Sequence, residues 1–274
     1  METIYIAVIS ITSIGAFCAA VLCIASKMMY VKVDERLAQI EELLPGANCG
    51  ACGYPGCTGY ANALIAGGDV SISLCTPGGE AVLKKLSEFL GIAAGEIIQK
   101  SAIVLCCGDK QQKKMNYAGI KTCAAAKELF CGEAACTAGC MGYGDCKAVC
   151  PFGAVCLENN LARINTRLCT GCGLCIKACP NNIISAENSG IAVAVLCKNT
   201  EKGAIVRKKC SKGCIGCGKC ACKCPAMAIT MEDNLAIIDY DKCTSFQRAL
   251  ASEGKQNCTH CADKCVTGCI RSFF

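Results

Sequence analysis

The sequence predicts an α+β protein with a single N-terminal transmembrane helix, a small mostly helical domain and a duplicated cysteine-rich module. Three observations support this prediction. Residues 3–26 carry no charge, 31 of the 274 residues are cysteine, and a pattern of about 90 residues occurs twice after residue 100. We therefore expect an anchor at residues 1–30, a domain at 31–100, and two modules at 101–190 and 191–274.

The first segment is long and apolar enough to cross a bilayer. Thr3 to Ser26 is rich in Ile, Val, Ala and Leu, and as a helix it would span about 36 Å against a hydrocarbon core of about 30 Å. Lys27, Lys32 and Arg36 follow it, so the positive-inside rule places that side in the cytoplasm. A cleaved signal peptide is the alternative, but no basic segment precedes the stretch. We expect a single-pass protein of the cytoplasmic (inner) cell membrane, with its cysteine-rich part on the cytoplasmic side.

Three helices are expected in the domain at residues 31–100. Val31–Leu44 has apolar residues at helical spacing and ends at Pro45-Gly46. Further helices are predicted at Thr58–Ala66 and at Glu80–Leu90, where Gly91 follows as a C-terminal cap. This part of the chain is therefore predicted to be mostly helical.

After Ser101, short β-like runs alternate with cysteine loops. The runs are Ala102–Leu105, Ile191–Leu196 and Asn234–Asp239. Val104-Leu105-Cys106 is echoed by Val195-Leu196-Cys197, and each is followed by a lysine-rich stretch, a lone cysteine (Cys123 or Cys210) and a cysteine run that ends in Cys-Pro. The sequence thus predicts two copies of one module.

The cysteines are more consistent with metal binding than with disulfides. Their number is odd, which leaves one thiol over in an all-disulfide scheme. Pairs with Cys-x2-Cys spacing recur, and such close pairs suit a metal or cluster. With 5% aromatic residues and no Trp, the core is small, so bound metal must supply part of the folding energy. Cysteine thiols must stay reduced until a metal binds, and this again indicates a location in the cytoplasm.

Two runs have the spacing of bacterial ferredoxins, and we expect two-cluster bacterial ferredoxin-like modules. They are Cys169-x2-Cys172-x2-Cys175-x3-Cys179-Pro180 and Cys214-x2-Cys217-x2-Cys220-x3-Cys224-Pro225. In two-cluster ferredoxins the fourth cysteine of such a run ligates the other [4Fe–4S] cluster. Zinc sites instead use two pairs separated by a long gap. Each run therefore needs a partner run.

The partner runs are less regular. They are Cys136-x3-Cys140-x5-Cys146-x3-Cys150-Pro151 and Cys243-x14-Cys258-x2-Cys261-x3-Cys265, where Val266 replaces the proline and Cys269 could substitute for Cys265. Crossing the fourth ligands predicts four clusters, held by Cys136, Cys140, Cys146 and Cys179; by Cys169, Cys172, Cys175 and Cys150; by Cys214, Cys217, Cys220 and Cys265; and by Cys243, Cys258, Cys261 and Cys224.

Two further groups of cysteines remain. Cys49, Cys52, Cys57 and Cys75 lie in a glycine-rich loop whose backbone N–H groups can approach the sulfurs, so we expect a fifth [4Fe–4S] cluster here, with zinc as the alternative. Cys106, Cys123, Cys197 and Cys210 could hold a sixth if the repeats pack about a pseudo-two-fold axis; otherwise they are buried or reactive thiols. The remaining module cysteines are expected to be apolar filler: Cys107, Cys131, Cys156, Cys222 and Cys269.

The formal charge of +6 is no argument for nucleic acid as a partner. Each oxidised [4Fe–4S] cluster with its four thiolates carries about −2, so five clusters would bring the loaded chain to about −4. A basic stripe with interleaved aromatic residues is also missing from the sequence. No dinucleotide loop, P-loop or nucleophile elbow is present in the sequence either. No catalytic residues are therefore predicted on this chain, and NAD or flavin chemistry is expected on other subunits.

The segment Leu44-Pro-Gly-Ala-Asn-Cys-Gly-Ala-Cys-Gly-Tyr-Pro-Gly-Cys57 behind a single anchor resembles the B subunit of the Rnf complex, as does Gly213-Cys-Ile-Gly-Cys-Gly-Lys-Cys220. The resemblance covers essentially the whole chain and is to the longer form, with extra ferredoxin modules. It implies an iron–sulfur subunit of an ion-translocating ferredoxin:NAD oxidoreductase that works with other membrane and peripheral subunits. Soluble ferredoxin would be the electron donor, and the pumped ion would be Na⁺ or H⁺.

Ferredoxins of this type are commonly acidic, so a basic patch could dock the donor. Lys208, Lys209 and Lys212 are the candidates for this role, although such lysines are often simply solvated. An autonomous enzyme is disfavoured because no substrate pocket or acid/base constellation is visible. The alternative function is a cluster-based redox-sensing or regulatory membrane protein.

Overall fold

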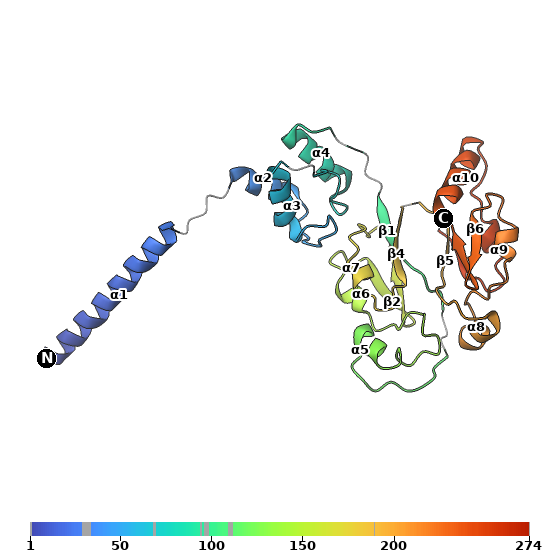
Figure 1. The fold of residues 1–274 in the computed structure, drawn as a ribbon, viewed down its shortest axis with the longest axis horizontal. Coiled ribbons are helices and arrows are strands. Elements are labelled where there is room, and N and C mark those ends of the chain that lie inside the picture. Colours follow the sequence, from blue (N-terminus) through green and yellow to red (C-terminus); the bar gives the residue numbers. More distant parts are fainter. Residues whose placement is uncertain are drawn as a thin grey trace.

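The computed structural model describes residues 2–273 except 29–33, 68–69, 94, 96–98, 109–111 and 189. The chain runs from a long helix through a small helical domain into the cysteine-rich part, which carries all the strands of the described residues (Figure 1). The predicted α+β composition and the N-terminal apolar helix are confirmed.

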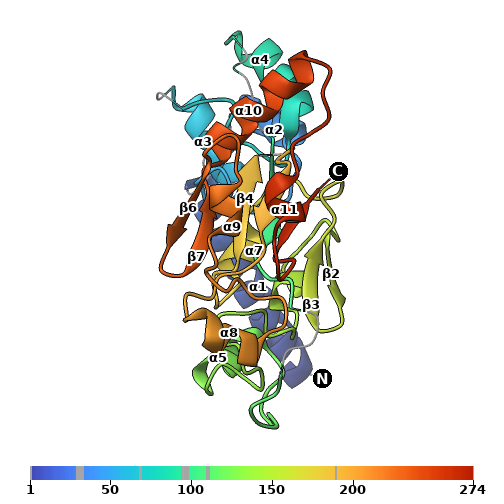
Figure 2. The same ribbon diagram turned by 90° about the vertical axis from the view of Figure 1, so that its right-hand side faces the viewer.

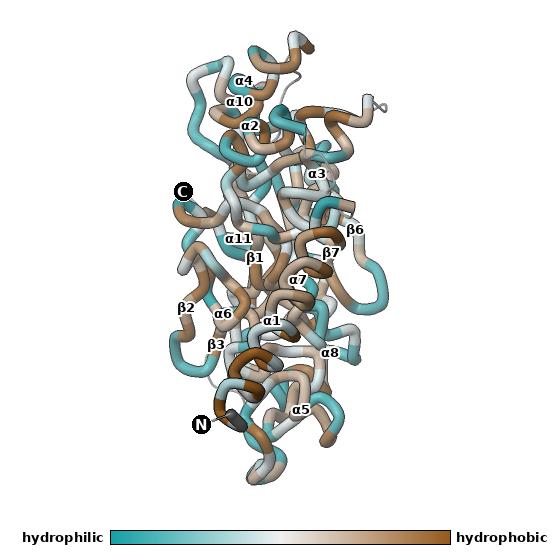
Figure 3. Tube along the Cα trace, turned by 90° about the vertical axis from the view of Figure 1, so that its left-hand side faces the viewer, coloured by the Kyte–Doolittle hydropathy of each residue, from teal (hydrophilic) through white to brown (hydrophobic). Residues whose placement is uncertain are grey.

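Helix α1 covers Glu2–Met28 and stands apart from the remainder of the chain (Figure 1). Within it, Ile4–Met28 has a mean hydropathy of 2.4 and no residue of the most apolar stretch is buried, so α1 is not a core helix. Figure 3 shows its largely apolar colouring. Among the described residues it is the one helix that could cross a membrane by length and composition. Lys27 lies in its last turn, whereas Lys32 lies outside the described residues.

Three helices form the domain that follows, close to the predicted positions. They are α2 (Glu35–Leu43), α3 (Gly56–Ile65) and α4 (Gly79–Leu90). Asp34 caps α2 by accepting a hydrogen bond from the Arg36 N–H, and Gly91 ends α4 in the left-handed conformation at φ 68°. Ile40, Tyr60 and Leu86 are buried between the helices. Residues 31–33 of the predicted first helix lie outside the described residues.

The first cysteine-rich half contains two antiparallel strand pairs. Strand β1 (Lys100–Val104) pairs with β4 (Ile184–Asn188), and β2 (Val155–Glu158) forms a hairpin with β3 (Leu161–Ile164). The helices of this half are α5 (Cys123–Glu128), α6 (Asp145–Ala148) and α7 (Leu174–Lys177). The strand expected at Ala102–Leu105 is thus confirmed as β1.

The second half repeats the same pairings in the same order. Strand β5 (Val193–Val195) pairs with β8 (Ile270–Ser272), and β6 (Ile229–Glu232) forms a hairpin with β7 (Leu235–Ile238). Its helices are α8 (Gly203–Lys209), α9 (Lys219–Cys222), α10 (Tyr240–Ser252) and α11 (His260–Asp263). The two hairpins lie on opposite sides of this part of the molecule, with α5 and α8 at one end (Figure 2).

Both hairpins use the same turn. Asn159-Asn160 and Asp233-Asn234 occupy the two central turn positions with positive φ at each residue, as a type I′ turn requires. The turns approach the cysteine loops closely. A Cβ placed on Gly142 would lie 2.3 Å from the Asn160 carbonyl oxygen, so only glycine fits there without a shift. The hairpins thereby fix the cysteine loops against the strands.

Candidate metal centres

The cysteines surround hollows instead of pairing. All 31 lie in described residues and none forms a disulfide. Within the described part of the chain, no three Cys, His or acidic side chains converge as they would on a single metal ion. The sulfurs instead line partly open hollows of about 310–370 Å³. Strands and short helices position the residues that line these hollows.

The first hollow, of about 370 Å³, has a lining that differs from one predicted ligand set. Its cysteines are Cys123, Cys140, Cys146 and Cys179, and we name it the Cys140 hollow. Cys179 reaches it from the following run, as crossed ligation requires. Cys136, predicted for this group, lines a different hollow. Cys123, predicted for a sixth cluster, lines this hollow.

The sequence contains a signal for this exchange. Aligned on the regular run, Cys140 and Cys146 occupy the first and third positions, and Tyr143 stands at the second. A fourth sulfur must therefore come from elsewhere in the chain. The Asp145 carboxylate accepts hydrogen bonds from the N–H groups of Cys123 at 2.8 Å and Ala124 at 2.9 Å. Together with the Thr122 side chain, which caps α5, these two hydrogen bonds fix the start of the helix, and with it Cys123, beside the run.

Cys150 joins the cysteines of the next run, which we name the Cys175 group (Cys150, Cys169, Cys172 and Cys175). Burial raises the pKa of Cys175 to about 11, and the negative charges of Cys169, Cys172 and Cys150 contribute to this rise. The Ala102 N–H of β1 donates to the Cys169 sulfur at 3.3 Å. Cys150 thus lies with the cysteines that follow it in sequence and not with its own run.

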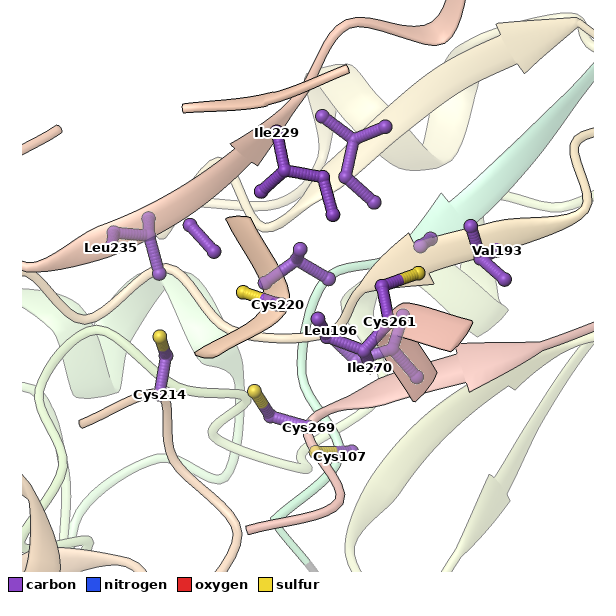
Figure 4. Close-up of a cluster of buried hydrophobic side chains, with 14 of the residues drawn as sticks. Cys107, Val193, Leu196, Cys214, Cys220, Ile229, Leu235, Cys261, Cys269 and Ile270 are labelled. Carbon is purple, nitrogen blue, oxygen red and sulfur yellow. The ribbon is translucent and has the colours of Figure 1, made fainter. Parts of the chain in front are cut away.

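The Cys214 hollow, of about 340 Å³, is lined by five cysteines: Cys214, Cys217, Cys220, Cys265 and Cys269. Figure 4 shows the sulfurs of Cys214, Cys220 and Cys269 directed toward the same space, with Cys261 directed away. The sulfurs of Cys265 and Cys269 lie 3.5 Å apart. Hydrogen bonding from Cys269 lowers the pKa of Cys265 to about 4 and of Cys214 to about 6. The same contacts raise the pKa of Cys269, and either sulfur of the Cys265–Cys269 pair can be the donor.

The Cys261 hollow, also about 340 Å³, is lined by Cys224, Cys243, Cys258 and Cys261, the grouping predicted from crossed ligation. The long gap between Cys243 and Cys258 is filled by α10 and a return loop. Gln247 closes that loop with two hydrogen bonds, donating to the Cys258 carbonyl and accepting from the Cys258 N–H, both at 2.9 Å. The expanded spacing is therefore compensated by a helical insertion.

The N-terminal domain brings together the Cys49 group: Cys49, Cys52, Cys57 and Cys75. Burial raises the pKa of Cys75, and the charges of the other three raise it further. Asn48 accepts the Cys57 N–H at 2.8 Å, and the Tyr60 hydroxyl donates to the Ser71 carbonyl at 2.8 Å, so side chains tie both ends of the loop. Burial also raises the pKa of Cys172, and the charge of Cys49 adds to this rise. The Cys49 group thus lies beside the Cys175 group.

A further hollow, of about 310 Å³, lies where the two halves meet. We name it the Cys197 hollow after one of its five cysteines, Cys106, Cys107, Cys136, Cys197 and Cys210. It contains three of the four residues predicted for a sixth cluster, with Cys136 in place of Cys123. Among the cysteines expected to be filler, Cys107 and Cys269 are buried and Cys131 half-buried, but Cys156 and Cys222 are exposed, so that expectation is wrong for the last two.

The three candidate docking lysines differ in their surroundings. Lys208 is exposed in the last turn of α8, next to Arg207. Lys209 forms an ion pair with Glu201 at 2.5 Å and is largely covered. Lys212 lines the Cys197 hollow, where burial raises the pKa of Cys107 to about 11 and the charge of Lys212 offsets a small part of this rise. The surface charges of this patch are therefore Arg207 and Lys208.

Family models match two segments of the chain. Residues 44–77 match the FeS family, an Fe–S cluster family, and residues 162–185 match the Fer4 family, a 4Fe–4S binding domain. The first match spans all four cysteines of the Cys49 group, and the second spans the regular run that ends at Cys179. Both matches fall on cysteine groups that the structure gathers.

Curated relatives match almost the whole chain. It is 42% identical over 252 residues to the B subunit of the Na⁺-translocating ferredoxin:NAD⁺ oxidoreductase complex of Acetobacterium woodii, covering 91% of this chain and 72% of that protein. It is 39% identical over 275 residues to the B subunit of the proton-translocating complex of Clostridium ljungdahlii, covering 99% and 93%. The B subunit of the ion-translocating oxidoreductase complex of Methanosarcina acetivorans is 37% identical over 86% of this chain and 90% of that protein. The chain therefore belongs to the B-subunit family of the ion-translocating ferredoxin:NAD⁺ oxidoreductases, the iron–sulfur electron-transfer subunits of these membrane complexes.

Proposed function

We propose that this chain accepts electrons from reduced ferredoxin and passes them to other subunits of an ion-translocating ferredoxin:NAD⁺ oxidoreductase. It does so with at least five [4Fe–4S] clusters, which supply one-electron transfer. The observation that carries the proposal is the gathering of cysteines into separate groups of four or more. The proposed ligands are Cys49, Cys52, Cys57 and Cys75; Cys123, Cys140, Cys146 and Cys179; Cys150, Cys169, Cys172 and Cys175; Cys214, Cys217, Cys220 and Cys265; and Cys224, Cys243, Cys258 and Cys261.

The donor sets suit [4Fe–4S] clusters. Each group contains four sulfurs held from two directions of the chain, and in the described residues no three of them converge as they would on a single ion. Backbone N–H groups point at cysteine sulfurs, as from Ala102 to Cys169 and from Ala228 to Cys224 at 3.4 Å. Such bonds stabilise thiolate charge and tune the potential of a bound cluster. For Cys265, the lowered pKa supports the role of ligand, and Cys269 lies close enough, at 3.5 Å, to donate to it.

We divide the chain as predicted, into an anchor (1–30), an N-terminal domain (31–100) and two duplicated modules (101–190 and 191–274). Three separate apolar cores support this division: one around Ile40, one around Leu161 and one around Val193. The shared order of strand pairs supports duplication. With Lys27 and Arg36 after the helix, the modules would face the cytoplasm. Protease added to intact cells should leave them uncut; digestion would reverse this topology.

The arrangement of the cysteine groups suggests a direction. The Cys49 group begins shortly after the anchor, so it must stay near the membrane, and it lies beside the Cys175 group. Electrons would enter at residues 101–274, which a soluble donor can reach, and leave through the N-terminal domain toward membrane partners. Arg207 and Lys208 are the exposed charges that could attract an acidic ferredoxin, mainly by raising the association rate.

Stopped-flow reduction by ferredoxin tests the proposal. The Cys57→Ala chain should still accept electrons from ferredoxin, since entry lies elsewhere, while turnover of the assembled complex should fall by more than tenfold. Cys131→Ala, a half-buried cysteine outside the proposed groups, is the matched control and should leave both unchanged. If Cys57→Ala abolishes reduction by ferredoxin while the other clusters remain loaded, entry is at the membrane-proximal group and the direction is wrong.

A further inference from the structure

The Cys197 hollow contains two equivalent pairs of cysteines, one from each half of the chain. Cys106 and Cys197 end the matching strand segments Val104-Leu105-Cys106 and Val195-Leu196-Cys197. Cys136 stands four residues before Cys140, and Cys210 stands four residues before Cys214, the first cysteine of its run. Counted from the runs, Cys136 is thus the partner of Cys210. The sequence expectation had paired Cys123 with Cys210 instead.

The backbone repeats this equivalence. The Leu105 N–H donates to the Ile183 carbonyl, and the Leu196 N–H donates to the Cys269 carbonyl, so both strand ends are fixed in the same way. The Cys140 N–H then donates to the Cys106 sulfur at 3.5 Å, and the Cys214 N–H donates to the Cys197 sulfur at 3.3 Å. Two unrelated buried thiols would have no reason to share this geometry.

Polar groups surround the sulfurs of this hollow. Asn199 is 3% exposed, and its side-chain amide donates to the Cys136 sulfur at 3.5 Å. The positive charges of Arg271 and Lys212 act on Cys107 from the same region. Apolar filler would need neither a buried amide donor nor cations, whereas a cluster with four thiolates carries net negative charge. Donors to sulfur and nearby cations are the surroundings that such charge requires.

We propose that the Cys197 hollow is a sixth [4Fe–4S] site, ligated by Cys106, Cys136, Cys197 and Cys210 across the seam between the two modules. Its ligands touch the backbone of Cys140 on one side and of Cys214 on the other. The site therefore connects the Cys140 hollow with the Cys214 hollow, and it deepens the proposed function by joining the two modules into one electron path. Cys107 is a bystander, because its thiol donates to the Lys212 carbonyl at 3.5 Å.

Iron and acid-labile sulfide analysis of the full chain, purified and reconstituted without oxygen, tests the proposal. We expect about 24 iron atoms per chain, against about 20 for five clusters. Cys136→Ala should lose about four, Cys210→Ala the same four, and the double variant no more than either single. Cys107→Ala and Cys131→Ala should lose none. Low-temperature EPR of the reduced Cys136→Ala chain should show fewer interacting clusters.

Each of the following results would contradict the proposed sixth site. A wild-type chain with about 20 iron atoms that ferredoxin still reduces would remove the sixth cluster and leave the proposed function intact. A double variant that loses about eight would place Cys136 and Cys210 in different clusters. Zinc in place of iron, or loss from Cys107→Ala and none from Cys106→Ala, would contradict the ligand set. Cys136→Ser, which keeps the side-chain volume, repeats the measurement should the alanine variant fold poorly.

Discussion

The two ferredoxin-like halves depart from regular cysteine spacing at different points, and each restores the site by different means. The first half has Tyr143 where a second cysteine is expected, and Cys123 lines the same hollow from a separate helix, α5, whose first N–H groups bond to Asp145. The second half keeps all its cysteines but inserts α10 between Cys243 and Cys258. In both, the sulfurs end around hollows of similar size. The site is thus defined by where the sulfurs meet in space, and sequence spacing is one of several ways to bring them there.

The largest effect is expected at the replaced ligand of the first half. Cys123→Ala should cost about four iron atoms per chain, because the Cys140 hollow then keeps only three sulfurs. Asp145→Ala should weaken the same cluster without removing a ligand, since the start of α5 loses the two hydrogen bonds to the Asp145 carboxylate, worth about 1 kcal/mol or more, while Thr122 still caps the helix. Iron analysis and EPR of the reconstituted chain measure both.

The matched comparison for Cys123 is the predicted ligand that the structure places elsewhere. Cys136→Ala should leave the Cys140 cluster intact, so its EPR signal should persist. If Cys136→Ala removes that signal and Cys123→Ala does not, the spacing-based assignment is right and the geometric one is wrong.

Much of this organisation could be predicted from the sequence because it is local. Strands β1, β5 and β7 follow from alternating or β-branched runs, and the crossing of Cys150 and Cys224 follows from the Cys-Pro run itself. The positions of Cys123 and Cys136 could not be predicted from spacing. Cys123 is brought to its hollow by a tertiary contact with Asp145, and Cys136 lines the hollow where the two halves meet. The contact between the Cys269 and Cys265 sulfurs likewise depends on a distance that spacing does not encode.

A smaller effect is expected at the insertion of the second half. Gln247→Ala removes both hydrogen bonds that close the loop onto Cys258, a loss of about 1–3 kcal/mol. All four sulfurs remain, so the cluster should still assemble but should release iron to a chelator about tenfold faster. Gln112→Ala, an exposed glutamine in the first half, is the control. An unchanged rate of iron release would mean that Cys258 keeps its position without the two hydrogen bonds to Gln247.

The smallest effect is expected at Cys269, which distinguishes the Cys214 hollow from its counterpart in the first half. Ile183 stands at the equivalent position there, so only the second half has a thiol next to its ligands. With Cys265 as the proposed ligand, the Cys269 S–H can donate to the Cys265 sulfur 3.5 Å away, and such a bond stabilises the reduced cluster more, because that state carries the larger negative charge. A hydrogen bond worth about 0.5–1.5 kcal/mol corresponds to about 20–60 mV for one electron. Cys269→Ala should therefore keep all its iron and lower the potential of one cluster by that amount in an EPR-monitored titration. Cys265→Ala should instead lose about four iron atoms. If the two variants exchange these outcomes, Cys269 is the ligand and Cys265 the donor.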